Sequence, residues 1–117
     1  MLRASAAANN IPVDLSAIAD SSIDSGIENG NALLAFADAV TGPDHAVIIA
    51  ARAELLERMG AGALVQSAAI AANFSMNDRA ANAIGIPMEA MFLDGSEDYR
   101  ASLGLNNFPS ARNTLGN

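Results

Sequence analysis

The sequence predicts an all-α protein, a compact bundle of helices. Alanine supplies 26 of the 117 residues, and alanine loses no side-chain entropy when it enters a helix. Runs of β-branched residues are few, and apolar residues recur every three to four positions over long stretches. Small side chains let helix axes approach closely, so we expect thin, tightly packed layers between the helices.

A single domain is expected over residues 1–117, because this length suits one hydrophobic core. Its N-terminal segment, residues 1–30, is weakly defined in the sequence. An alanine-rich start is interrupted over 9–12, where two asparagines precede a proline. Leu15 and Ile18 then stand at helical spacing, and Asp14 is favourable in a first helical turn.

The helical core is expected over residues 31–103. A first helix over 31–40 ends before a threonine, a glycine and a proline. Of these, Thr41 or Gly42 caps the next helix, which runs over 44–59. This second helix places one apolar stripe toward the core, formed by Ile48, Ala51, Leu55 and Met59.

The longest predicted helix covers residues 61–84 and follows a joint made by Gly60 and Gly62. Its apolar side chains point in all directions, and a helix without a polar face is typical of a buried, central position. Gly85 stands where a helix C-terminal glycine is expected, and Pro87 prevents the helix from continuing. We therefore expect a buried central helix that ends at residue 84.

Two short helices are predicted to follow, over 87–93 and 96–103, and Gly104 ends the second. The tail over 104–117 contains Pro109 and shows little periodicity. We expect it to be extended or loosely packed.

Charge and cysteine content exclude several functions. The net charge is −7, lysine is absent, and the six arginines are spread along the chain. Nucleic-acid binding needs clustered cations, and anionic membrane surfaces repel an acidic domain. The absence of cysteine excludes disulfides, thiolate metal sites and cysteine nucleophiles. Neither a nucleic-acid partner nor a membrane partner is therefore expected.

Residues 59–77 carry no charge, over a length that makes a membrane span worth considering. Alanine supplies most of its apolar content, and amides and glycines interrupt it, whereas membrane insertion needs leucine-like hydrophobicity. We expect a buried helix of a soluble protein, with the cytoplasm as its location.

Candidate catalytic residues are sparse. His45 is the single histidine, and zinc needs three or four ligands, so no metal site is expected. At the start of a helix, His45 is expected to be a solvated first-turn residue. Among the carboxylates, Glu28 and Glu54 are candidates, although Glu54 stands four residues before Arg58, the spacing of an ordinary surface ion pair. No cofactor is indicated.

A polar stripe lies on the predicted central helix. At about 100° per residue, Gln66, Asn73 and Asn77 fall on nearly one line, and Asp78 and Arg79 follow directly. Buried amides need hydrogen-bond partners. The stripe is therefore either the lining of a small-molecule pocket or a network that fixes helix register or a subunit contact, and we favour the network.

Four stretches of the second half resemble a known family: residues 32–37, 55–60, 63–74 and 78–87. Their most specific features are Asn73-Phe74, Arg79-Ala80 and Gly85-Ile86-Pro87. Together they resemble the C-terminal half of the alkylhydroperoxidase D-like (carboxymuconolactone decarboxylase) family, over roughly residues 30–90. The resemblance implies an all-helical, oligomeric protein in which Asn73, Phe74, Arg79, Gly85 and Pro87 have packing and helix-end roles.

Peroxidase members of that family use a Cys-x-x-Cys pair with an upstream glutamate and a following histidine. No position of this chain matches those residues. On the family's order of elements, the chain begins at or just after the place of the cysteines. The resemblance therefore implies either a truncated reading frame or a naturally short, non-redox relative.

Three functional hypotheses follow. The leading one is a homo-oligomeric helical module without peroxidase activity of its own. The second is a cysteine-independent, decarboxylase-type enzyme that acts on a small lactone or acid through His45 and either Glu28 or Glu54. The third is a small-molecule binding protein that uses Gln66, Asn73 and Asn77.

Overall fold

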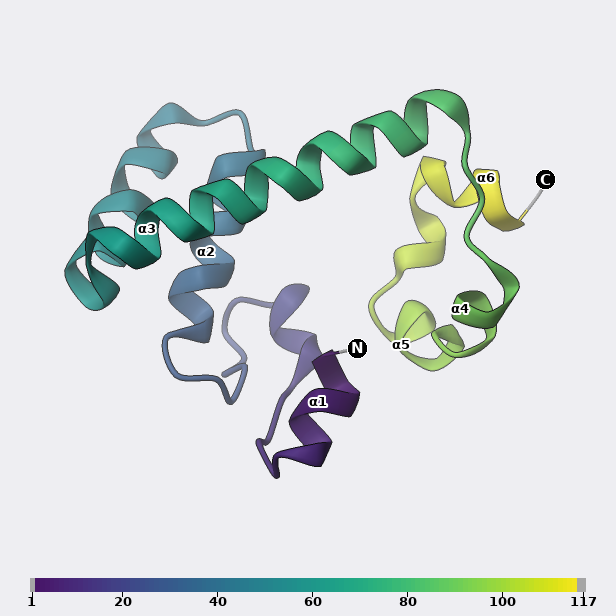
Figure 1. Ribbon diagram of the computed structural model, residues 1–117, viewed down its shortest axis with the longest axis horizontal. Helices are drawn as coiled ribbons and strands as arrows, with labels where there is room; N and C mark the ends of the chain where they lie inside the picture. The colour runs from purple at the N-terminus through teal and green to yellow at the C-terminus, as the bar shows by residue number, and fades with distance from the viewer. Residues whose placement is uncertain (1, 116–117) are drawn as a thin grey trace. The chain divides into compact units, whose positions relative to one another are not determined.

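The computed structural model describes residues 2–115, and every regular element in this part is helical, which confirms the all-α prediction (Figure 1). The elements, where η marks a 3-10 helix, are α1 (Leu2–Ala8), η1 (Leu15–Ile18), α2 (Gly30–Thr41), α3 (His45–Ile84), α4 (Ala90–Asp94), α5 (Glu97–Ser102), η2 (Leu105–Asn107), η3 (Pro109–Ala111) and α6 (Arg112–Leu115). The single domain expected from the sequence divides into two compact units, Met1–Asn73 and Phe74–Asn117. No helix within residues 2–115 combines the length and hydropathy that a bilayer span requires.

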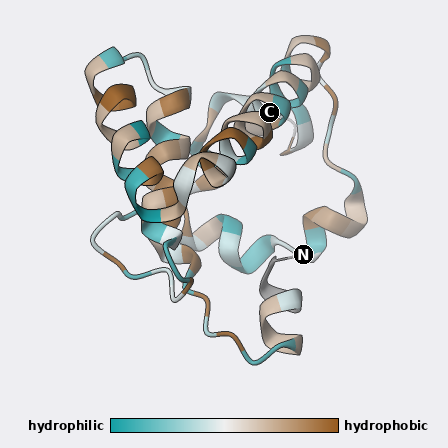
Figure 2. Cartoon of the chain, turned by 60° about the vertical axis from the view of Figure 1, so that its left-hand side comes forward, coloured by the Kyte–Doolittle hydropathy of each residue, from teal (hydrophilic) through white to brown (hydrophobic). Residues whose placement is uncertain are grey.

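The core of the first unit forms where α2 packs against residues 45–59 of α3. Hydrophobic residues recur along these helices (Figure 2), and the buried ones make one cluster: Ala32, Phe36, Ala39, Ala51 and Leu55. The predicted stripe of the second helix is confirmed, because Ile48 and Met59 pack against this cluster. Leu55 is completely buried, so its side chain is the centre of the core.

The N-terminus of α3 is capped by a different residue from the one expected. Asp44 precedes α3, and its carboxylate accepts the Ala46 N–H at 2.8 Å, as an N-cap side chain does. Thr41 instead ends α2, where its hydroxyl donates to the Ala37 carbonyl at 3.0 Å. Capping by Thr41 or Gly42 was the wrong prediction, because the Asp44 side chain reaches the free N–H groups of the first turn, and aspartate is a stronger N-cap than threonine or glycine.

Gly60 divides α3 into two helical segments, 45–59 and 61–84, as its predicted role as a joint requires. Its backbone angles, φ 83° and ψ 173°, are non-helical, and a positive φ of this kind is accessible mainly to glycine. Leu64, one turn beyond the break, packs against the core of the first unit. The break therefore brings the start of the second segment back onto α2 and the first segment.

The second segment of α3 is not the buried helix that the sequence predicts. Val65, Ile70 and Phe74 are 67%, 59% and 62% exposed. Its half-buried positions, among them Leu64, Ser67 and Ala71, lie on one side of the helix. Apolar composition all round a helix indicates burial only where other side chains cover it, and the alanines that predominate in the neighbouring core cover little.

The C-terminus of α3 follows the prediction. Gly85 has φ 70°, and the Ile86 N–H donates to the Ala81 carbonyl at 3.0 Å. A left-handed glycine together with this six-to-one hydrogen bond defines a Schellman motif. Gly85 is thus the residue that ends the helix, as its position before a proline indicates.

The second unit continues as short helical turns. The helices expected over 87–93 and 96–103 correspond to α4 and α5, and Gly104 ends α5 with φ 67°. The tail over 104–117 was expected to be extended or loosely packed, and an extended tail is wrong, because η2, η3 and α6 occupy its described part. Pro109 begins η3, where a fixed φ favours a helical turn. The Thr114 hydroxyl accepts the Met88 N–H at 2.7 Å, which fastens α6 to the segment before α4.

Aspartate side chains organise the turns of the weakly patterned N-terminal segment. Each accepts the backbone N–H two residues ahead: Asp14 from Ser16 (2.8 Å), Asp20 from Ser22 (2.9 Å) and Asp24 from Gly26 (2.9 Å). The Ser22 hydroxyl also donates to Asp20, and it is the main cause that lowers the pKa of this carboxyl, followed by the backbone bond. The helix expected after residue 12 is accordingly one 3-10 turn, η1, capped by Asp14.

We expect Leu55→Ala to lower the free energy of unfolding by about 3 kcal/mol, because it leaves a cavity in a core that has few other large side chains. Leu56→Ala is the matched control. That neighbouring side chain is 46% exposed, so its loss is expected to cost under about 1 kcal/mol. Urea unfolding followed by circular dichroism measures both; equal losses would contradict the central position of Leu55.

Candidate functional site

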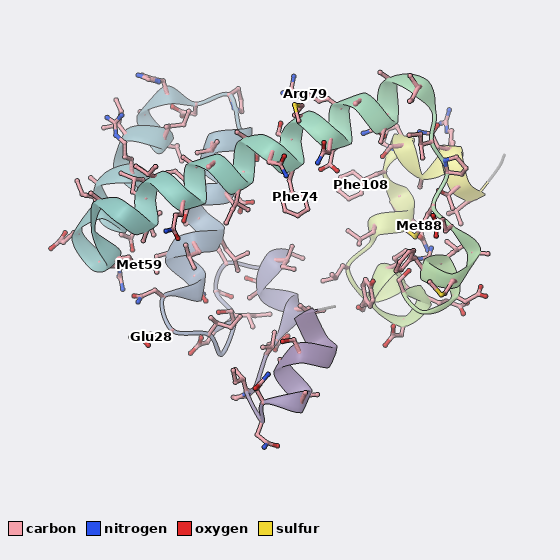
Figure 3. The ribbon with its side chains drawn as sticks, viewed as in Figure 1. Glu28, Met59, Phe74, Arg79, Met88 and Phe108 are labelled. Carbon is pink, nitrogen blue, oxygen red and sulfur yellow. The ribbon has the colours of Figure 1, made fainter. Side chains whose placement is uncertain are left out.

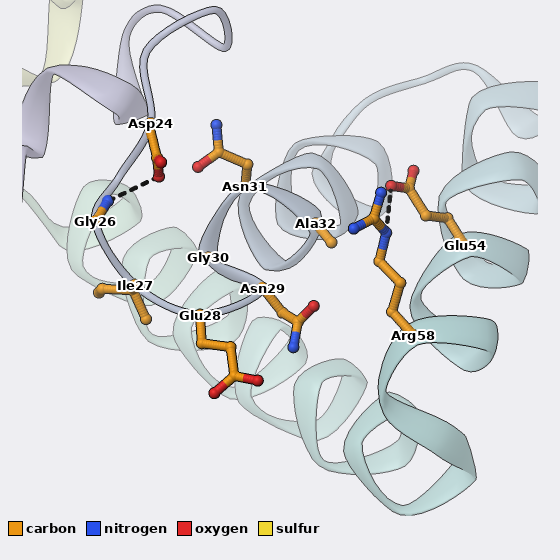
Figure 4. A pocket seen from close by; sticks show the side chains of 10 residues that line it. All are labelled: Asp24, Gly26, Ile27, Glu28, Asn29, Gly30, Asn31, Ala32, Glu54 and Arg58. Atoms are coloured by element: carbon orange, nitrogen blue, oxygen red, sulfur yellow. Dashed lines mark hydrogen bonds and ion pairs between the residues drawn. The ribbon is translucent and has the colours of Figure 1, made fainter.

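A hollow of about 550 Å³ lies in the first unit, beside the start of α2 (Figure 4). The loop before α2, the first turn of α2 and two residues of α3 line it: Asp24, Gly26, Ile27, Glu28, Asn29, Gly30, Asn31, Ala32, Glu54 and Arg58. The sequence candidates Glu28 and Glu54 are therefore brought to one place. This volume is in the range of small-molecule sites.

The loop that forms one wall is held by Asn31. Its side-chain oxygen accepts the Ser25 N–H at 3.0 Å, and its amide donates to the Ile23 carbonyl at 2.7 Å. Ser25 is buried, and its carbonyl accepts the Asp14 N–H at 3.0 Å. One asparagine thus fixes the loop on the first turn of α2.

Two glycines allow this loop to pass close to other parts of the backbone. Gly26 has φ 75°, and a Cβ atom there would overlap the Pro12 carbonyl oxygen. Gly30 has no comparable φ, but its Cβ atom would overlap the Ser25 hydroxyl. The loop therefore needs the smallest residue at both positions, and only Gly26 also needs a left-handed backbone.

The charged groups of the hollow are mostly engaged. The Asp24 carboxylate accepts the Gly26 N–H, and Arg58 Nε lies 2.9 Å from Glu54 Oε1. This i,i+4 ion pair confirms the spacing argument, and both side chains are about half exposed, so it contributes little stability. Glu28 is exposed (Figure 4). No group of three or more potential metal-ligating side chains occurs among the described residues.

His45 does not line the hollow. It is the exposed first residue of α3, in keeping with a solvated first-turn position. Glu54 is nine residues further along the same helix, which places it about 13 Å away along the axis and on the opposite face. A histidine–carboxylate pair with Glu54 is therefore not assembled.

The polar stripe of α3, formed by Gln66, Asn73 and Asn77, is exposed, and so are Asp78 and Arg79, which follow it. The premise that these amides are buried is therefore wrong for this chain by itself. None of the five residues lines the hollow beside α2. A binding surface at the three amides would have to form against another molecule.

Sequence reasoning did not single out Asp24 or Asn31, or the buried Arg100 of the second unit. The loop before α2 could have been recognised from its composition. Residues 24–31 are rich in aspartate, serine, asparagine and glycine, which is typical of turns stabilised by side chains. Arg100 gave no signal, because its partners depend on how short turns fold back on one another.

No family model, curated protein or solved structure matches this chain. The resemblance to the alkylhydroperoxidase D-like family therefore stays a prediction that rests on the four sequence stretches alone.

Gly26→Ala is expected to destabilise the protein by about 2 kcal/mol, because the substitution both overlaps Pro12 and disfavours a positive φ. Gly62→Ala is the control. A Cβ atom there meets open space inside a helix, so we expect a gain of about 0.5–1 kcal/mol. Thermal unfolding measures both, and a neutral Gly26→Ala would show that the loop is not held as described.

Proposed function

We propose that this chain is a helical module that associates with further copies of itself and has no peroxidase activity of its own. The observation that carries the proposal is an exposed surface without charges on the second segment of α3, which includes the apolar Val65 and Ile70. We name it the uncharged face; it consists of Val65, Gln66, Ala69, Ile70 and Asn73, all exposed. At 100° per residue these positions lie within about 140° of one another.

The uncharged face mixes apolar side chains with amides. Val65 and Ile70 are more than half exposed, and the small Ala69 between them allows another helix to approach closely. Gln66 and Asn73 offer donors and acceptors on the same face. Single amides within an apolar seam can fix the register of paired helices, which suits the network interpretation of these residues.

Charge favours a second copy as the occupant. The chain carries a net charge of −7, so most pairs of surfaces from two copies would bring carboxylates together, and like charges in contact oppose association. Residues 59–77 carry no charge. Two copies can therefore meet along this segment without that repulsion, in the self-complementary manner of a two-fold interface.

Exposed apolar side chains continue beyond the uncharged face. Phe74 (Figure 3) and Met76, at the start of the second unit, are each 62% exposed. A standard interface covers about 800 Å² on each partner, so these neighbouring residues can extend the contact between two copies.

The enzyme hypothesis has less support. Glu54 is paired with Arg58, and His45 is on the other face of the helix, so these two residues do not form an acid–base pair. Glu28 lines the hollow beside α2, and His45 does not. The resemblance to an oligomeric helical family agrees with the module. We also propose that the chain is a member of that family and that it is located in the cytoplasm.

Ile70→Glu is expected to convert the associated protein into a monomer, because it places one carboxylate from each copy on the uncharged face. Val47→Glu is the matched control, since Val47 is also about half exposed but belongs to the first segment of α3. Size-exclusion chromatography with light scattering, at 5 to about 100 µM, measures the mass.

The unchanged protein and Val47→Glu are expected to give at least a dimer at the higher concentration. A monomeric mass for the unchanged protein over the whole range would contradict the proposal. A dimer that persists in Ile70→Glu would show that copies associate through another surface.

A further inference from the structure

Arg100 of α5 is a buried cation in the second unit, with 8% of its surface exposed. Its guanidinium donates from Nε to Ser96 Oγ (2.8 Å), from Nη1 to Asn106 Oδ1 (2.7 Å) and from Nη2 to the Leu93 carbonyl (2.9 Å). These bonds join the end of α4, the start of α5 and the turn η2. The guanidinium is therefore held in one position.

All three acceptors are neutral. A guanidinium has five N–H groups, so two donors remain after these bonds. Burying a charge is costly unless an opposite charge accompanies it. Arg100 is thus a fixed cation that would gain from an anion placed beside it.

Arg100 lines a hollow of about 330 Å³ that the second unit forms by itself. No carboxylate lines it, and Arg100 is the single arginine among its lining residues. Apolar side chains make much of the remaining wall: Ile86, Met88, Leu105 and Phe108. All four are partly open to solvent, and Figure 3 labels Met88 and Phe108, which come from segments far apart in the sequence.

We propose that this hollow binds a small carboxylic acid with an apolar body. One buried guanidinium matches one carboxylate in charge, and the two N–H groups that remain, one on Nη1 and one on Nη2, are the donors left for it. A doubly charged phosphate would need more than one cation to balance its charge, and Arg100 is the single arginine that lines the hollow. The apolar side chains would cover the body of the ligand, and this site does not depend on self-association of the chain.

The hollow is tested by titrating the full-length, ¹⁵N-labelled protein with hexanoate and, separately, with hexan-1-ol. The alcohol has the same tail and no charge. We expect saturable amide shifts with hexanoate at residues around the hollow, and at least about ten-fold weaker binding of the alcohol, which corresponds to 1.4 kcal/mol. Equal binding of the two probes would overturn the role of Arg100.

A variant that fills the hollow avoids removing Arg100, whose loss would also disrupt folding. Ala111→Leu adds bulk at a lining position and leaves the three acceptors of Arg100 in place. Ala101→Leu, at an exposed position of α5 that does not line the hollow, is the control. We expect Ala111→Leu to weaken hexanoate binding at least ten-fold and Ala101→Leu to leave it unchanged. No saturable shift in the unchanged protein, or equal binding by both variants, would overturn the proposal.

Discussion

The packing of α2 against the first segment of α3, centred on Leu55, is the interaction on which the first unit depends. Leu55 is fully buried, and apart from Phe36 the buried members of its cluster are alanines. Burial of an alanine side chain contributes much less than burial of a leucine, because the gain scales with the apolar area removed from water. The core is therefore narrow, and its stability is concentrated in two side chains.

This constraint explains the exposure of the second segment of α3. A leucine-rich chain of this length could cover a third helix with long side chains, whereas alanines cover little beyond their own backbone. After Gly60, only one side of the helix packs against other residues, and on that side Leu64 contacts the core. The same composition that favours helices thus leaves apolar side chains such as Val65 and Ile70 in solvent. Association of copies is the most direct way to bury them.

Local features of the structure were predictable from the sequence. The break at Gly60, the Schellman glycine Gly85 and the ion pair of Glu54 with Arg58 each depend on a few neighbouring residues. Features that depend on distant parts were not. The exposure of residues 61–84 depends on whether other parts of the protein cover them. The periodicity of a helix carries no information about that cover.

The hollow beside α2 and the hollow at Arg100 also combine features that depend on neighbouring residues with features that depend on distant ones. The loop around Gly26 and Asn31 has a local turn signal, but its hollow exists because α3 brings Glu54 and Arg58 beside it. The buried position of Arg100 depends on Asn106 and Leu93, which three successive turns bring together. Neither arrangement has a fixed sequence spacing that a reader could recognise. Of the sequence candidates, Glu28 and Glu54 share a site, and His45 does not belong to it.

The central claim is that a narrow core is completed by contact between copies through the uncharged face. The melting temperature as a function of protein concentration tests it most directly, because association that accompanies folding makes stability depend on concentration. We expect the melting temperature to rise by several degrees between about 1 and 100 µM, since a hundred-fold change in concentration corresponds to about 2.7 kcal/mol per dimer. A melting temperature that does not change over this range would contradict it.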